Sequence, residues 1–149
     1  MEAESKLLIR DLYRGEDQSN SVEWCFFVNC LHSRFLRATK QKSSDPSRPF
    51  SPVDLRYFHE KFYGGSQQIT IDQITSFWRW FGPIMQTLRF KKHINALWFS
   101  GLLLGMVSKE DCNKELEKQR DGTFLVRFSV GNPGLFAIAF VYDDRNGGL

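Results

Sequence analysis

One arginine in an apolar strand is the residue of this sequence with the clearest chemical use. Arg127 lies in the segment GTFLVRFS, residues 122–129. Because side chains alternate between the two faces of a strand, Arg127 shares its face with Leu125 and Ser129, and no carboxylate lies beside it in the sequence. A guanidinium among apolar neighbours is costly without a partner, and its fork of N–H donors fits two oxygens of a phosphate. The strand alone leaves two alternatives open: Arg127 binds a phosphate, or it reaches solvent or a distant carboxylate.

The segments around Arg127 predict a small mixed region over residues 105–149. Ser108 is placed to cap a short helix, with acidic residues in the first turn of that helix. A turn precedes the strand of Arg127, and a glycine- and proline-containing turn at residues 131–134 joins it to a second strand over residues 135–142. We expect one helix and two antiparallel strands here.

The preceding part of the chain predicts an all-helical unit over residues 22–104. Apolar residues recur there at helical spacing. The first helix is expected over residues 22–39, with the polar residues 19–21 as its start. Residues 1–21 are mostly polar and are expected to form a flexible N-terminal segment. The fold class is therefore α+β, with a helical unit followed by the mixed region.

Several start and stop signals divide the helical unit. Residues 51–52 place a serine cap before a proline at the first helical position, and the glycine pair at 64–65 ends that helix. Thr70 and Gln73 form a capping box for the next helix. Pro83 lies inside this second apolar pattern and is expected to kink or split the helix.

The order of these motifs resembles a known family. A capped helix, the strand FLVRFS, a tight turn and a second strand resemble the start of a Src-homology-2 (SH2) domain, whose signature is Phe-Leu-Val-Arg-x-Ser. Over residues 22–146 the sequence is similar to the linker and SH2 region of STAT transcription factors. The segments that carry this likeness are PVDLRYFHEKFYG at 52–64, FWRWF at 77–81, LW at 97–98, GMVSK at 105–109 and DGTFLVRFS at 121–129.

The resemblance implies roles for individual residues. Arg127 would be the central phosphate-binding arginine, Lys109 the second phosphate contact, and Ser129 a hydroxyl donor. A phosphotyrosine phosphate carries almost two negative charges and accepts several hydrogen bonds, so this set of donors suits it. The resemblance therefore implies phosphotyrosine-dependent protein–protein interaction in signal transduction and transcription regulation.

The sequence departs from the family just after Ser129. STAT proteins usually continue with an acidic residue and a serine, whereas Val130 and Gly131 stand here, followed by Asn132. The phosphate loop thus lacks one hydroxyl donor. We expect the backbone amides of Gly131 and Asn132 to supply part of that function.

The end of the sequence at Leu149 predicts a truncated SH2 domain. The later strands, the second helix and the specificity pocket of the family are missing from it, as are the tail tyrosine and the STAT DNA-binding domain. The second strand would then have a free edge, with an apolar face left uncovered. Such an edge pairs readily with another chain, so we expect a homodimer or aggregation.

Composition and the remaining motifs narrow the function class. The net charge of +3 fits an anionic ligand but is too small for a nucleic-acid signature. No nucleophile or base stands at a fixed spacing from the three histidines, so an enzyme is not expected, and neither is a cofactor. The absence of signal-peptide character, of a long apolar run and of paired cysteines predicts a cytoplasmic and nuclear protein without a membrane partner.

Two other interpretations compete with phosphotyrosine binding. An EF-hand over residues 52–81 would use Phe62, Gly64, Ser66 and Gln73 as metal positions, and none is a carboxylate, so no metal is expected. The aromatic and basic residues at 78–80 and 89–92 are similar in kind to those of single-strand nucleic-acid binders, although helical spacing favours a core and a solvated face. The alternative function is accordingly a structural or nucleic-acid-associated helical module with a non-functional SH2 region. Direct DNA contact is not expected.

Overall fold

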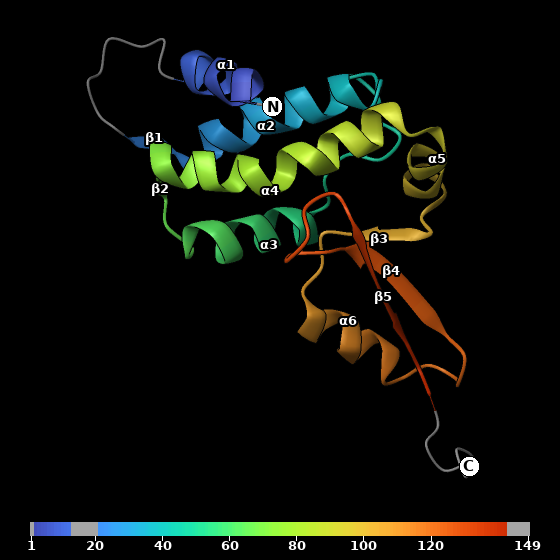
Figure 1. Cartoon of the computed structure of the whole chain (residues 1–149). Helices are drawn as coiled ribbons and strands as arrows, with labels where there is room; N and C mark the ends of the chain where they lie inside the picture. The colour runs from blue at the N-terminus through green and yellow to red at the C-terminus, as the bar shows by residue number, and fades with distance from the viewer. Residues whose placement is uncertain (1, 13–20, 143–149) are drawn as a thin grey trace.

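A computed structural model describes residues 2–12 and 21–142 of the chain (Figure 1). The helical elements and their ribbon are α1 Glu2–Leu12, β1 Ser21–Glu23, α2 Trp24–Ala38, α3 Pro52–Tyr63, β2 Gln68–Thr70, α4 Ile71–Phe90 and α5 Lys92–Ser100. The mixed region follows with β3 Leu103–Gly105, α6 Lys109–Leu116, β4 Phe124–Phe128 and β5 Phe136–Phe140. The helices α1 to α5 form the upper part of the molecule, and the sheet with α6 lies below them. The predicted α+β class is confirmed.

Two helix–loop–helix units and the helix α5 make up the helical part. The first contains α1 and α2, the second contains α3 and α4, and the antiparallel ribbon β1–β2 joins their loops. Val22 pairs with Ile69 at the centre of this ribbon, and both side chains are buried. The pairing explains why α2 begins at Trp24 rather than at residue 22 as predicted: a tertiary hydrogen-bonded ribbon takes residues 21–23.

The N-terminal helix was not predicted. The sequence analysis assigned residues 1–21 to a flexible segment, but residues 2–12 form α1, and residues 13–20 lie outside the described part. Leu8 is fully buried and Leu12 nearly so, packed into the core of the helical unit. The short apolar patch around Leu8 is therefore one face of a helix that tertiary contacts stabilise.

The predicted helix signals of the second unit are present. Ser51 Oγ accepts a hydrogen bond from the Asp54 backbone at 3.1 Å, and the Asp54 carboxylate accepts one from the Ser51 backbone at 2.8 Å, so the two form a capping box. Gly64 ends α3 in a left-handed conformation with φ of +58°. The capping box of Thr70 and Gln73 opens α4. Pro83 does not split α4, which is one helix across that position.

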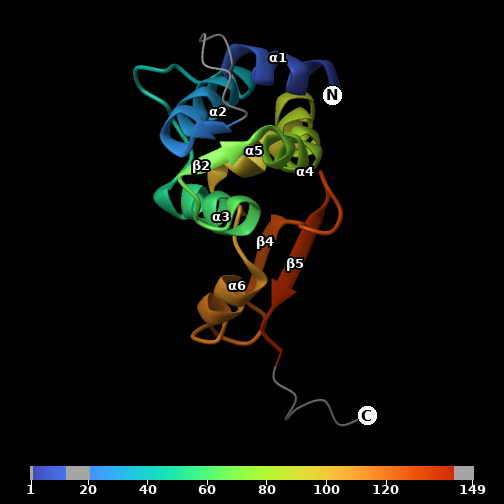
Figure 2. The same cartoon turned by 90° about the vertical axis from the view of Figure 1, so that its left-hand side faces the viewer.

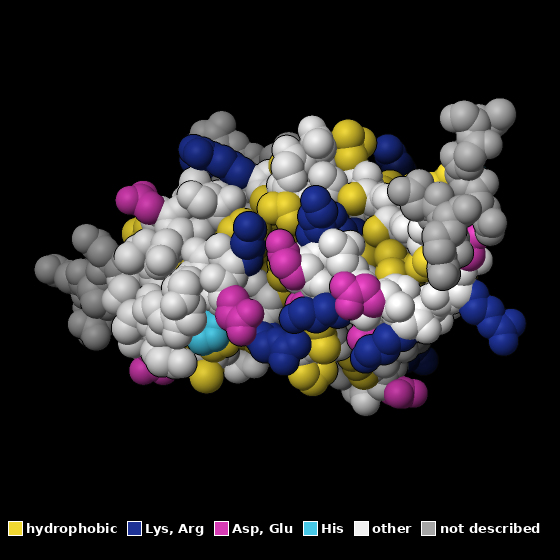
Figure 3. Space-filling model, turned by 90° about the horizontal axis from the view of Figure 1, so that it is seen from below, with side chains coloured by type: hydrophobic (Ala, Val, Ile, Leu, Met, Phe, Trp, Pro, Cys, Tyr) yellow, Lys and Arg dark blue, Asp and Glu magenta, His cyan; other side chains and the backbone are white. Residues whose placement is uncertain are grey.

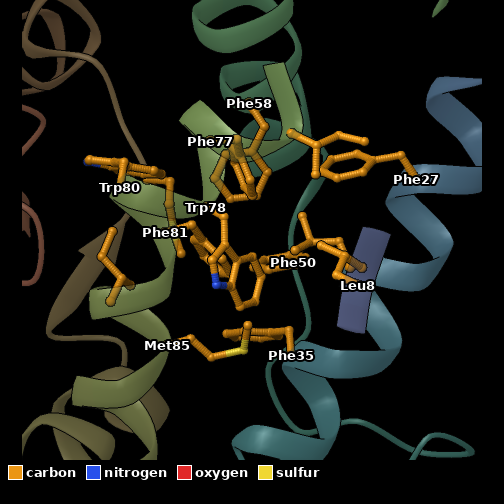
Figure 4. Packing of buried hydrophobic residues seen from close by; sticks show 14 of the residues in the cluster. Leu8, Phe27, Phe35, Phe50, Phe58, Phe77, Trp78, Trp80, Phe81 and Met85 are labelled. Carbon is orange, nitrogen blue, oxygen red and sulfur yellow. The ribbon is translucent and has the colours of Figure 1, made fainter. Parts of the chain in front are cut away.

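Aromatic rings fill the core between α2, α3 and α4 (Figure 4). Phe77 contacts Phe27 and Phe58 in edge-to-face geometry, with ring centroids 5.6 Å and 5.2 Å apart. The same core continues through Trp98 to Phe128 of β4. The helical part and the sheet therefore share one hydrophobic interior.

The sheet contains three strands in the order β3-β4-β5. β3 runs parallel to β4, with Gly105 opposite Arg127, and β5 runs antiparallel to β4. The sequence predicted only β4 and β5. β3 was missed because three residues with an irregular register carry no alternating pattern of their own. β3 belongs to the sheet, although two of its three residues lie before the border at residue 105 that the sequence analysis predicted.

Two charged side chains, the half-buried Arg48 and the buried Asp54, anchor β3 to the helical part. The Arg48 guanidinium donates to the carbonyl of Leu103 at 2.8 Å and to that of Leu104 at 3.2 Å, and it also donates to the Trp98 carbonyl. It lies over the Trp98 ring at 3.8 Å. Asp54 accepts from the Met106 backbone N–H at 3.4 Å, and burial raises the pKa of this carboxyl. We call Arg48 and Asp54 the β3 anchor.

One face of the sheet is apolar, and the part of it farthest from Phe128 is exposed. Phe124 lies opposite Phe140, and Val126 lies opposite Ile138, so these side chains share a face. Phe124, Ile138 and Phe140 are 61%, 65% and 66% exposed, which is unusual for side chains of this kind in adjacent strands. Among the described residues no strand pairs with the outer edge of β5.

Replacement of Gly105 by alanine should destabilise the protein. A Cβ at this position would lie 3.3 Å from Asp54 Oδ1 and 3.3 Å from the Trp98 ring, and the backbone φ is +108°. We expect a loss of about 1–3 kcal/mol in the free energy of unfolding, measured by urea denaturation. Gly122→Ala is the control, because Gly122 also has a positive φ of +83° but has open space around it. Equal losses in the two variants would contradict tight packing at the β3 anchor.

The open face and edge of β5 should make the isolated chain self-associate. Phe140→Lys places a charge on this face and should shift the protein toward the monomer in light scattering. Phe26→Lys is the matched control, since Phe26 is 49% exposed on α2 in the helical part. A monomeric wild-type chain, or an equal effect of both substitutions, would show that β5 does not mediate association.

Candidate phosphate-binding site

A pocket of about 350 Å³ lies where α3, the start of α6 and the end of β4 meet. Figure 2 shows α3 and α6 on the same side of β4 and β5. We call this cavity the Arg127 pocket. The pocket brings together four of the five predicted site residues, Arg127, Lys109, Ser129 and Gly131, and its remaining lining comes from Tyr57, Lys61, Ser108, Glu110 and Val130.

Arg127 lines this pocket and has one donor without a partner among the described residues. It lies in the central strand between Gly105 of β3 and Ala137 of β5, so both paired neighbours are small. One guanidinium nitrogen donates weakly to the Phe128 carbonyl at 3.4 Å. The Nε atom is buried and has no hydrogen-bond partner in the described part of the chain. A buried donor of a charged group without a partner is expensive, and an anion entering the pocket would remove that cost.

The start of α6 places Lys109 at the rim. Ser108 caps the helix, its Oγ accepting from the Asp111 backbone at 3.0 Å, and Lys109 is the first helical residue. The positive end of the helix dipole therefore faces the same side as the exposed Lys109 side chain. Glu110 also lines the pocket, so the rim carries charges of both signs.

Ser129 is held firmly by its backbone. Its carbonyl accepts from the Trp80 indole N–H at 3.0 Å, and its N–H donates to the Leu135 carbonyl at 2.9 Å. The Ser129 Oγ accepts from the Asn132 backbone N–H at 3.2 Å, which leaves the hydroxyl proton free to donate.

Asn132 does not line the pocket. The sequence analysis expected its backbone amide to help bind phosphate, but that amide donates to Ser129 Oγ within the turn. Gly131, by contrast, does line the pocket. Of the two backbone amides expected to replace the hydroxyl donor that is missing after Ser129, only that of Gly131 belongs to a residue lining the pocket.

Helix α3 contributes two residues that sequence reasoning missed. Tyr57 and Lys61 stand four residues apart and so lie on one face of α3, and both line the pocket. Burial raises the pKa of Tyr57, while Arg127 lowers it and Glu110 raises it further, which agrees with the closeness of these groups. The sequence shows the four-residue spacing of Tyr57 and Lys61, but it does not show that this face of α3 lies against α6 and β4.

The loop of the second helix–loop–helix unit is closed by its own hydrogen bonds. His59 Nε2 lies 2.6 Å from the Ser66 carbonyl oxygen, and Ser66 Oγ donates to the Gln68 carbonyl at 2.9 Å. None of the four expected metal positions is a carboxylate. Within residues 2–12 and 21–142 no three His, Cys, Asp or Glu side chains are grouped to hold a metal ion.

The surface charge is mixed. Seen from below, Lys and Arg side chains gather in the middle of the face with Asp and Glu side chains between them (Figure 3). Because charges of both signs alternate on this face, it does not form a continuous basic stripe. No helix in the described ranges has the length and apolar character to cross a membrane.

Comparison with known proteins defines the class of both parts. The EF-hand fold domain family matches residues 1–91, and the SH2 domain family matches residues 98–148. The chain therefore belongs to the EF-hand fold domain family through its helical part, and an SH2 segment follows that part. This agrees with the paired helix–loop–helix units and with the pocket around Arg127.

Three relatives match the chain across both its helical part and its SH2 segment. The chain is 41% identical over 135 residues to signal transducer and activator of transcription A of Dictyostelium discoideum, covering 91% of this chain and 19% of that protein. It is 35% identical over 147 residues to signal transducer and activator of transcription B of the same organism, covering 99% and 12%. It is 32% identical over 141 residues to signal transducer and activator of transcription 1 of Caenorhabditis elegans, covering 85% and 19%.

The chain is thus a STAT-like linker and SH2 segment, as its motifs predicted. It spans less than a fifth of the length of these relatives.

Proposed function

We propose that the chain binds phosphotyrosine in a protein or peptide through the Arg127 pocket and acts in signal transduction and transcription regulation. The carrying observation is the buried Nε of Arg127, which lacks a partner among the described residues. Lys109 at the rim and the free hydroxyl proton of Ser129 supply further donors to the same space. Their convergence suits a dianionic group better than a neutral ligand.

The proposed interaction is non-enzymatic. The pocket contains donors for an anion but no nucleophile with an adjacent base, so binding is the activity that the described side chains support. The proposal includes association of two copies, and it places the chain in the cytoplasm and nucleus.

The alternative is a helical module whose SH2 part binds no phosphotyrosine. The two functions differ in one measurement, the binding of phosphotyrosine peptides compared with the same peptides unphosphorylated. The proposed function requires a clear preference for the phosphorylated set. Equal signals would favour the alternative.

Substitution of Arg127 should abolish phosphopeptide binding. Loss of a partly desolvated charge pair costs about 2–5 kcal/mol, or ~30-fold or more in affinity. Arg127→Lys should also fail, because an ammonium does not reproduce the planar fork. Lys109→Ala should cost less, since the helix start still favours the anion. Calorimetric titration measures all three, and wild-type affinity in Arg127→Ala would show that the site lies elsewhere.

Substitution of Lys61 tests the contribution of α3 to the same pocket. Lys61→Ala should weaken phosphopeptide binding about two- to fivefold, the range of an exposed charge interaction. Arg56→Ala is the control, because Arg56 is also an exposed cation on α3 but does not line the pocket. If both variants lose affinity equally, the effect is one of net charge, and α3 plays no specific part.

A further inference from the structure

A second cationic recess lies between α2 and α4 and shares no residue with the Arg127 pocket. It has a volume of about 180 Å³. Arg34 and Arg37 of α2 and Arg89 of α4 line it, and Trp78 and Met85 form an apolar wall. We call it the arginine cleft.

Two of the three arginines form no ion pair with the described residues. Arg34 forms an ion pair with Asp11 of α1. Arg37 and Arg89 are exposed and form no ion pair with any residue of the described ranges. The Arg89 guanidinium lies 5.0 Å from the centre of the Phe90 ring. Unpaired arginines on a surface are often simply solvated, so the charges alone would not define a site.

The wall of the cleft contains an independent sign of a missing ligand. Trp78 is only 5% exposed, and its indole N–H is buried without a hydrogen-bond partner. The other buried indoles behave differently: Trp80 donates to Ser129 at 3.0 Å and Trp98 donates to Arg48 at 3.3 Å. Figure 4 shows Trp78 in the space between α2 and α4, with its indole nitrogen on the side of Met85. An unpaired buried donor therefore lies in the same recess as the unpaired cations.

We propose that the arginine cleft is a docking site for a carboxylate side chain of an acidic protein segment. The forks of Arg37 and Arg89 would bind the carboxylate oxygens, and the Trp78 N–H would donate from the wall. A protein segment fits better than a free ion because the rim is also apolar. Phe90 is 69% exposed beside Arg89, and only a ligand with apolar groups next to its charge would cover that ring.

The indole N–H signals of the intact chain provide the test. In a two-dimensional ¹H–¹⁵N spectrum the signal of Trp78 is assigned by its loss in Trp78→Phe. Addition of a hexaglutamate peptide should shift this signal in a saturable way. The signals of Trp80 and Trp98 should stay in place, because their N–H groups are already bonded within the protein.

Two variants separate the cleft from general charge. The double substitution Arg37→Gln and Arg89→Gln should weaken hexaglutamate binding roughly tenfold or more, given the strength of charge-assisted hydrogen bonds. Arg79→Gln is the control, since Arg79 is exposed on α4 but does not line the cleft. Arg127→Ala should leave the Trp78 titration unchanged, so the result does not depend on the phosphotyrosine site.

Titration with inorganic phosphate distinguishes a docking site from a simple anion site. Tighter binding of hexaglutamate than of phosphate supports the proposal. A Trp78 signal that does not move, that moves equally in the double variant, or that responds to phosphate as strongly as to the peptide would overturn it.

Discussion

The contact of the half-buried Arg48 side chain with β3 is the interaction on which the rest of the structure depends. Its guanidinium donates hydrogen bonds to the carbonyls of Leu103 and Leu104. Without it, these carbonyls of an edge strand would need a further strand or water as their partner. The Arg48 backbone is itself held, because Gln41 both accepts from its N–H and donates to its carbonyl. This chain of bonds fixes β3 to the helical part, and β3 in turn fixes β4 beside it.

The position of Arg127 follows from this arrangement. With β3 on one side and β5 on the other, β4 is the central strand and its arginine cannot swing out past an edge. Gly105 serves two purposes at once, since it lets the β3 anchor approach closely and it leaves room beside Arg127. The same small residue therefore connects the packing of the two parts with the shape of the binding pocket.

Local signals in the sequence predicted the parts of this fold that local chemistry decides. The caps at Ser51 and Thr70 and the stop at Gly64 involve residues within one turn of each other, and all are present. The β1–β2 ribbon, β3 and the helical state of α1 were missed because each depends on contacts distant in sequence. The same division holds for the site. The strand motif predicted Arg127 and Ser129, and the family resemblance predicted Lys109; all three line one pocket. Tyr57 and Lys61 line it too, through contacts between α3 and the mixed region that no short pattern encodes.

The bond from Trp80 to Ser129 has a consequence for how such a segment can be transferred between proteins. SH2 domains are commonly treated as portable modules, but here the carbonyl at the end of the arginine strand is capped by an indole from α4. The turn that follows also rests on this helix, since a Cβ at Gly134 would lie 3.1 Å from the Pro83 side chain. A graft of residues 98–142 onto another scaffold would carry Arg127 and Ser129 but leave behind the helix that shapes their loop. The structural unit therefore includes α4, and the unit of recombination is longer than the SH2 segment alone.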